Sequence, residues 1–111
     1  MKSVLLDENV PRLLKGDLPQ FDVRTVGEMG WSGKENGELL QLAEAVFDVL
    51  LTADRRMPTQ QNLAGRGIGV VVLETSSTKL EDIRPHIVAL RDAITSSQPG
   101  AATFVPARGA R

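Results

Sequence analysis

Five short apolar segments alternate along the chain with segments that have helical or polar character. Residues 2–6, 48–52 and 70–73 contain uninterrupted runs of Val and Leu. Runs of this kind are typical of strands buried on both faces of a parallel sheet. Residues 21–26 alternate apolar with polar side chains, which predicts a half-exposed strand near a sheet edge. Residues 102–105 are a marginal fifth strand.

Two short helices are expected where polar residues and glycines punctuate the chain. The first begins after Asn9, a plausible N-cap, and Pro11 lies in its first turn, where the missing N–H costs little. The second covers residues 58–64, with a proline at its start and Gly65 after its end.

Two longer helices are predicted by apolar residues that recur at helical spacing, over residues 39–47 and 80–94. Pro85 should kink or split the second of these. The expected N-terminal signals are a capping box at Ser32 and Glu35, or a cap at Asn36, for one helix, and a capping box at Thr78 and Glu81 for the other.

Strands that alternate with helices predict an α/β fold, a three-layer α/β/α sandwich around a mainly parallel sheet of four to five strands. The second strand in chain order is the most polar and belongs at an edge, so we expect the spatial order 2-1-3-4-5. Residues 1–106 form one domain in this interpretation, and residues 107–111 form a loose C-terminal tail.

Composition narrows the possible chemistry. The chain has 111 residues, a formal net charge of -1 and no cysteine, so disulfides and thiolate metal sites are excluded. The apolar start is too short for a signal peptide, and no stretch is long enough to span a membrane. A soluble, cytoplasmic protein with no membrane partner is the simplest expectation.

Two acidic residues directly follow buried strands: Asp7 after the first and Asp54 after the third. Ligands of open parallel sheets bind beyond the carboxyl ends of the strands, where the strand order reverses, so the two acids should face one another across a crevice. Such a pair suits Mg²⁺ or Mn²⁺, which prefer oxygen ligands and can generate a nucleophile for phosphodiester hydrolysis. Candidates for a third ligand are Glu8, Glu35, Asn36 and Glu38.

Each of these side chains also has a simpler interpretation. Asp7 or Glu8 would be favourable near the positive end of a helix dipole. Asp54 and Asn36 could cap the elements that follow them, and Glu38 could be a solvated residue of a first helical turn.

Nucleic-acid binding would need a local patch, because the overall charge is close to zero. Arg12 and Arg55 could contact phosphate, with Arg56, Arg66 and Lys34 as further cations, although scattered surface charge is the simpler interpretation. The polar run Gln60-Gln61-Asn62 could bind phosphates or bases, or could be merely exposed. Trp31 could stack on a base, but packing against the core is the more common role of such a residue.

Taken together, these motifs resemble the small stand-alone bacterial PIN-like domains over nearly the whole chain. The residues that carry the resemblance are Leu5-Leu6-Asp7-Glu8-Asn9-Val10-Pro11, Gly30-Trp31, Asn36-Gly37-Glu38-Leu39-Leu40, Asp48-Val49-Leu50-Leu51-Thr52-Ala53-Asp54-Arg55, Gln60-Gln61-Asn62-Leu63-Ala64-Gly65 and Val70-Val71-Val72-Leu73.

The resemblance implies a divalent-metal-dependent ribonuclease of a family that includes the toxins of toxin–antitoxin pairs, with RNA as substrate and an antitoxin protein as partner. By position, the first PIN acid falls on Asp7 and the last on Asp54. An acid common at the start of the intervening helix falls on Asn36, whose neutral amide should weaken metal affinity; Glu35 or Glu38 could compensate. Long apolar helix faces also make a homodimer an expectation.

Two other hypotheses remain. A catalytically inactive PIN-like module would bind nucleic acid or protein without hydrolysis. A phosphoacceptor receiver domain would use Asp7 and Glu8 for metal and Asp54 for phosphate, with Thr75 or Ser76 as the hydroxyl position. No lysine follows the fifth strand, where a receiver domain would need one.

Overall fold

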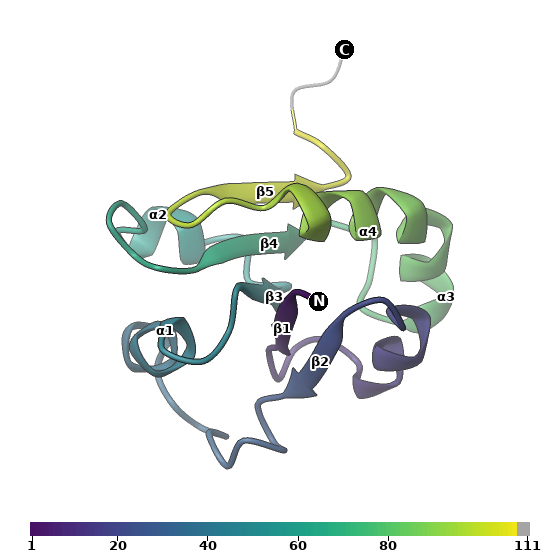
Figure 1. Cartoon of the computed structure of the whole chain (residues 1–111). Coiled ribbons are helices and arrows are strands. Elements are labelled where there is room, and N and C mark those ends of the chain that lie inside the picture. The colour runs from purple at the N-terminus through teal and green to yellow at the C-terminus, as the bar shows by residue number, and fades with distance from the viewer. Residues whose placement is uncertain (109–111) are drawn as a thin grey trace.

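The protein is an α/β fold built on one five-stranded parallel sheet, described here from a computed structural model that covers residues 1–108 (Figure 1). The strand order is β2-β1-β3-β4-β5, and every neighbouring pair is parallel. Both the fold class and the strand order predicted from the sequence are confirmed. The strands are β1 (Ser3–Leu6), β2 (Asp22–Thr25), β3 (Val49–Thr52), β4 (Gly69–Leu73) and β5 (Ala102–Val105).

Helices cover both faces of this sheet, which gives three layers. In Figure 1, α1 and α2 lie on one side of the sheet, and α3 and α4 lie on the other. The elements are the 3₁₀ helix η1 (Arg12–Asp17), α1 (Asn36–Glu44), α2 (Met57–Gln60), α3 (Leu80–Ile83), the 3₁₀ helix η2 (Arg84–His86) and α4 (Ile87–Ser96). The helix expected over residues 80–94 is therefore split at Pro85, as predicted.

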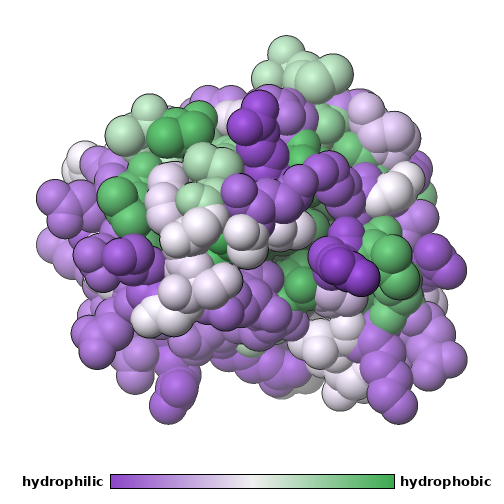
Figure 2. All heavy atoms as spheres, turned by 90° about the horizontal axis from the view of Figure 1, so that it is seen from below, coloured by the Kyte–Doolittle hydropathy of each residue, from purple (hydrophilic) through white to green (hydrophobic). Residues whose placement is uncertain are grey.

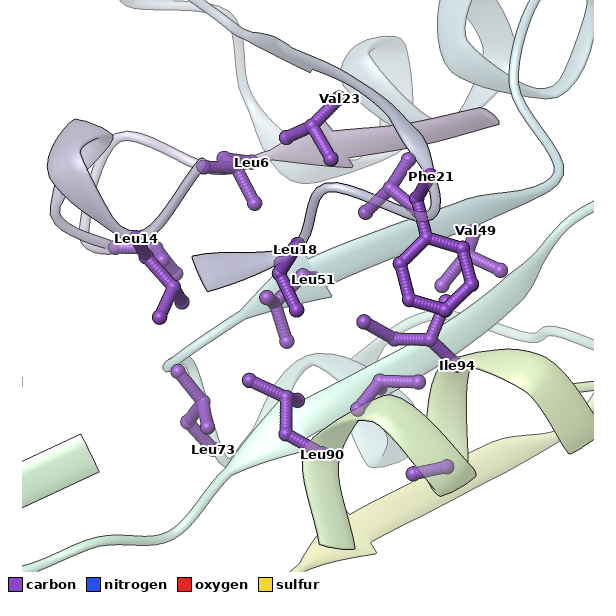
Figure 3. Packing of buried hydrophobic residues seen from close by; sticks show 14 of the residues in the cluster. Leu6, Leu14, Leu18, Phe21, Val23, Val49, Leu51, Leu73, Leu90 and Ile94 are labelled. Carbon is purple, nitrogen blue, oxygen red and sulfur yellow. The ribbon is translucent and has the colours of Figure 1, made fainter. Parts of the chain in front are cut away.

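The apolar strands serve two separate cores because successive side chains of a strand point to opposite faces. In β3, Val49 and Leu51 pack on one face, whereas Leu50 packs on the other. The first core joins the sheet to η1, α3 and α4, and Figure 3 shows Leu14 of η1, Leu18 directly after η1 and Leu90 of α4 around Leu51. This arrangement explains why the central strands read as continuous apolar runs.

The second core lies under α1 and α2. Leu40 and Met57 are fully buried against Leu50 of the sheet. Trp31 packs at the border of this core, with its ring edge-to-face on Phe47 at a centroid distance of 6.2 Å. Core packing, and not an exposed stacking surface, is thus the observed environment of the tryptophan.

The sequence signals expected to begin the helices do not act as predicted. The residue before α1 is Glu35 and the residue before α3 is Lys79, and neither carries a side-chain capping bond. The helix expected over residues 58–64 has only four residues, Met57–Gln60, because Gln61 returns to an extended conformation. Asn9 does not cap η1, since its side chain bonds to the end of β3.

Side chains on the outside of the fold are mainly polar. The face seen in Figure 2 is covered mostly by hydrophilic residues, which interrupt the apolar areas. None of the helices in residues 1–108 has the length and apolar character needed to cross a membrane. In the segment predicted as a loose tail, Arg108 contacts Glu74 and Phe104, and residues 109–111 lie outside the described part.

Candidate functional site

The carboxyl ends of β1 and β3 lie side by side and carry the two acids predicted from the sequence. Leu6 is in register with Leu51, and the backbone N–H of Asp7 donates to the Leu51 carbonyl at 2.9 Å, which continues the ladder by one residue. Because β1 pairs with β2 on one side and with β3 on the other, this is the point where the strand order reverses. The structure therefore brings Asp7 and Asp54 to one edge.

A threonine hydroxyl links the two acids. The Thr52 hydroxyl donates to Asp7 Oδ2 at 2.8 Å and accepts the backbone N–H of Asp54 at 3.0 Å. The second oxygen of Asp7 accepts the backbone N–H of Glu8 at 2.8 Å. Thr52 is fully buried, so the hydroxyl is held in place while the carboxylates remain partly accessible.

Asn9 strengthens the same junction from β1. Its Oδ1 accepts the backbone N–H of Ala53 at 3.0 Å, and its side chain also lies within hydrogen-bond distance of the Thr52 hydroxyl. Asp7 and Asn9 on one strand end, and Thr52 and Asp54 on the other, thus form an interlocked set of polar side chains.

Asp54 is further held by two groups from outside the strands. Asn36, the first residue of α1, donates its side-chain amide to Asp54 Oδ2 at 3.1 Å, and the Arg56 backbone N–H donates to Oδ1 at 3.0 Å. Partial burial raises the pKa of Asp54, but these hydrogen bonds and the charge of Arg56 outweigh burial, so the pKa lies below its ordinary value. The carboxylate is therefore ionised at neutral pH.

Two of the other acids proposed as third metal ligands, Glu8 and Glu38, make contacts of their own. Glu8 accepts the backbone N–H of Gly33 at 2.9 Å, which ties the loop before α1 to the end of β1. Glu38 is exposed, and its carboxylate lies 3.7 Å from the ammonium group of Lys34, which is four residues earlier in the chain. Within residues 1–108, no three acidic or histidine side chains converge in a way that could hold a metal ion.

Among the residues predicted to bind nucleic acid, Gln61 lies beside the beginning of α1. Gln61 borders a hollow of about 570 Å³ together with Asn36, Glu35 and Glu38 at the beginning of α1. Gln60 is exposed on α2, whereas Asn62 uses its Oδ1 to accept the Ala64 backbone N–H at 3.2 Å. Only part of the polar run therefore faces the site.

The two predicted phosphate-binding arginines lie in different places. Arg55 is at the carboxyl edge, where its guanidinium donates to the Thr75 carbonyl at 3.0 Å and approaches Glu74 at 4.0 Å. Arg12 is on η1 and lines a separate hollow of about 620 Å³ with Leu13 and Glu28, among others. A second hollow at the acid edge, of about 520 Å³, is bordered by Asn9, Ala53 and Thr78.

Thr52 and Asn9 are the site residues whose roles were not anticipated. Thr52 ends a buried strand two residues before Asp54, and Asn9 stands two residues after Asp7. The available signal was a repeated pattern at the ends of two buried strands. In each case two polar residues are separated by one other residue, Asp7 and Asn9 at one strand end and Thr52 and Asp54 at the other.

Comparison with protein-family models, with curated proteins and with solved structures gives no match to this chain. A functional interpretation therefore depends on the geometry of the carboxyl edge and on the motifs of the sequence.

Proposed function

We propose that this protein is a divalent-metal-dependent ribonuclease of the PIN-like type, with Asp7 and Asp54 as its metal-binding acids. The observation that carries the proposal is the shared Thr52 hydroxyl, which binds the Asp7 carboxylate and the backbone N–H of Asp54 on neighbouring strand ends, where the strand order reverses. Two carboxylates at one edge of a sheet can share a divalent cation, because hard divalent ions prefer oxygen ligands.

The donor set suits Mg²⁺ or Mn²⁺. Each carboxylate oxygen of Asp7 and Asp54 accepts one hydrogen bond within the fold. Each therefore retains a further lone pair that could bind a cation. Two carboxylates, with the Asn36 amide oxygen as a neutral third donor, balance a divalent charge and leave positions for water or phosphate. When bound, such an ion stabilises negative charge on a phosphodiester and activates water for attack.

The protein groups around the acids would position an RNA strand. Asn36 contacts Asp54 and shares a hollow with Gln61, and Asn9 bonds to the end of β3, so polar side chains adjoin the acids. Arg55 supplies a cation at the same edge. Arg12, which lies away from these acids, would contact a longer substrate at most.

The biological setting belongs to the proposal as well. A toxin of a toxin–antitoxin pair would act on cellular RNA and be inhibited by a small antitoxin protein, and a homodimer would be compatible with exposed Val88 on α4 and Val46 after α1. The resemblance of the motifs to PIN-like domains supports this setting.

One observation favours a second candidate, a PIN-like module that binds without hydrolysis. Glu8 and Glu38 are engaged with Gly33 and Lys34, so no third carboxylate joins Asp7 and Asp54 among the described residues. The receiver-domain hypothesis has less support, because the Thr75 hydroxyl donates to the Ser77 carbonyl at 2.6 Å and is buried.

The proposal is tested by incubating the protein with single-stranded and structured RNA in the presence of Mn²⁺. We expect cleavage by the unmodified protein and its loss in Asp7→Asn, in Asp54→Asn and in the double variant. Asp92→Asn, which changes an exposed acid on α4, should retain full activity and serves as the matched control.

Each alternative gives a different result. Cleavage that persists in the double variant would rule out the roles of both acids. RNA binding without cleavage in Mn²⁺ or Mg²⁺ would support the non-hydrolytic module. Transfer of phosphate from acetyl phosphate to Asp54 would support the receiver domain.

A further inference from the structure

Two consecutive arginines follow Asp54, and their side chains are held very differently. Arg55 is directed to the end of β4, where it donates to the Thr75 carbonyl at 3.0 Å. Its second partner, Glu74, is already engaged by Arg108 through two hydrogen bonds at 2.7 and 2.6 Å. Arg55 is therefore fixed by contacts that do not involve the acid pair.

Arg56 instead lies against Asp54. Its Nε is 3.7 Å from Asp54 Oδ1, the same oxygen that accepts the Arg56 backbone N–H. The Arg56 side chain is 76% exposed, and it forms no other ion pair within residues 1–108. The cation paired with this carboxylate is thus an exposed side chain, whose backbone N–H is held by the same carboxylate.

A guanidinium at this position competes with a divalent cation for Asp54. Both are positive, and both seek the remaining lone pairs of one carboxylate. An exposed ion pair of this geometry contributes little free energy, so the side chain can leave Asp54 at small cost. Phosphate is the better partner for a free guanidinium, since planar arginine binds phosphate oxygens through two parallel hydrogen bonds.

We propose that Arg56 couples the binding of the divalent cation to the binding of the RNA strand; this inference rests on the proposed function. Without substrate, Arg56 stays at Asp54 and opposes the cation. When a strand binds, a phosphate group draws Arg56 away, and Asp54 becomes available to the cation. Because such coupling is reciprocal, the cation also strengthens binding of the strand.

The test measures Mn²⁺ affinity by electron paramagnetic resonance, with and without a single-stranded phosphorothioate oligodeoxynucleotide that resists hydrolysis. We expect the oligonucleotide to tighten Mn²⁺ binding by the unmodified protein. In Arg56→Gln, Mn²⁺ alone should bind about two- to five-fold more tightly, as expected for the loss of one exposed opposing charge. The additional effect of the oligonucleotide should then shrink toward none.

Arg24→Gln is the control, because it removes the same charge from an exposed arginine of β2 that pairs with Asp22 and not with Asp54. We expect it to leave Mn²⁺ affinity without the oligonucleotide unchanged. Arg56→Lys keeps the charge and should bind Mn²⁺ as the unmodified protein does. Circular dichroism verifies that each variant is folded.

The possible failures are distinct. Equal Mn²⁺ affinity and equal coupling in Arg56→Gln and in the unmodified protein would overturn the role of Arg56, while the proposed function would stand. If Asp54→Asn does not weaken Mn²⁺ binding, both the coupling and the proposed metal site are wrong.

Discussion

Thr52 is the residue on which the relative position of the two acids depends. It is fully buried, it donates its hydroxyl hydrogen to Asp7, and its oxygen accepts the backbone N–H of Asp54. Removal of the hydroxyl would leave the Asp54 N–H without this acceptor and one Asp7 oxygen without a donor. Loss of partners for buried polar groups is more costly than the net value of the hydrogen bonds themselves.

Thr52→Val therefore tests this junction while it preserves the shape of the side chain. We expect the free energy of unfolding, measured by urea denaturation, to fall by about 1–3 kcal/mol. Mn²⁺ affinity should fall by about ten-fold or more, as is usual when a group that orients a metal ligand is removed.

Thr103→Val on β5 is the control, because the Thr103 side chain forms no hydrogen bond among residues 1–108 and should change neither quantity much. Unchanged Mn²⁺ affinity in a folded Thr52→Val protein would show that the hydroxyl does not position the acids.

The acid pair could be predicted from the sequence because each acid follows a buried strand. Parallel strands end at the same edge, so Asp7 and Asp54 converge in any order that makes their strands neighbours. The hydrogen bond that the Ala53 N–H donates to the Asn9 side chain could not be predicted, since it joins residues that are 44 positions apart. Local sequence around Asn9 signals only a helix cap, and the long-range partner prevails.

At the scale of elements, the helix ends do not use the caps that the sequence predicted. Asn36, a candidate cap, donates to Asp54 from the first position of α1. The hydroxyl of Ser77, which was not considered as a cap, accepts the backbone N–H of Lys79 at 3.1 Å before α3. Pro85 acts as predicted, because its effect on a helix is a local steric one.

The C-terminal end of α4 is closed by a residue from the opposite end of the chain. The Lys2 ammonium donates to the carbonyls of Ile94, Thr95 and Ser97 at 3.1, 2.8 and 2.8 Å. These are among the carbonyls that a helix end leaves without intrahelical partners, and a cation is favourable at this end of the helix dipole.

Lys2→Met retains most of the aliphatic stem and removes the three donors. We expect the free energy of unfolding to fall by about 1–2 kcal/mol, and hydrogen exchange to become faster in the last turn of α4. Lys79→Met, at an exposed position before α3, should have a much smaller effect. Equal effects of the two substitutions would contradict a capping role of Lys2.

At the scale of the whole molecule, charged side chains join β3, β4 and the residues after β5. Glu74 accepts two hydrogen bonds from Arg108 and lies 4.0 Å from Arg55, and Arg108 also stacks on Phe104 with its guanidinium carbon 3.8 Å from the ring centroid. The hydrogen bonds from Arg108 lower the pKa of Glu74, and burial opposes them to a smaller extent. The pKa of Arg108 is raised by the same partner.

A lowered carboxyl pKa makes stability depend on acidity. The folded state releases this proton more readily than the unfolded state, so the stabilising contribution is complete above the ordinary pKa of a glutamate and is lost as the pH falls through the folded-state pKa. We expect Glu74→Gln to reduce the loss of stability on acidification, as followed by urea denaturation at a series of pH values.

Glu81→Gln, which changes an exposed glutamate that has no ion pair among residues 1–108, should leave the acid dependence close to that of the unmodified protein. Identical pH profiles for Glu74→Gln and the unmodified protein would contradict the role of the Glu74–Arg108 contact.

The presence of an apolar core on each side of the sheet has a consequence for strand alignment. When one face of a strand is exposed to solvent, a shift of its pairing register by one residue is unfavourable, because the shift would expose its apolar side chains. In β3 that safeguard is missing, since Leu50 and Leu51 would merely exchange cores. The polar contacts of Thr52 and Ala53 with β1 penalise such slippage, so the same side chains that assemble the acid edge also discriminate the native pairing from its nearest misfolded competitor.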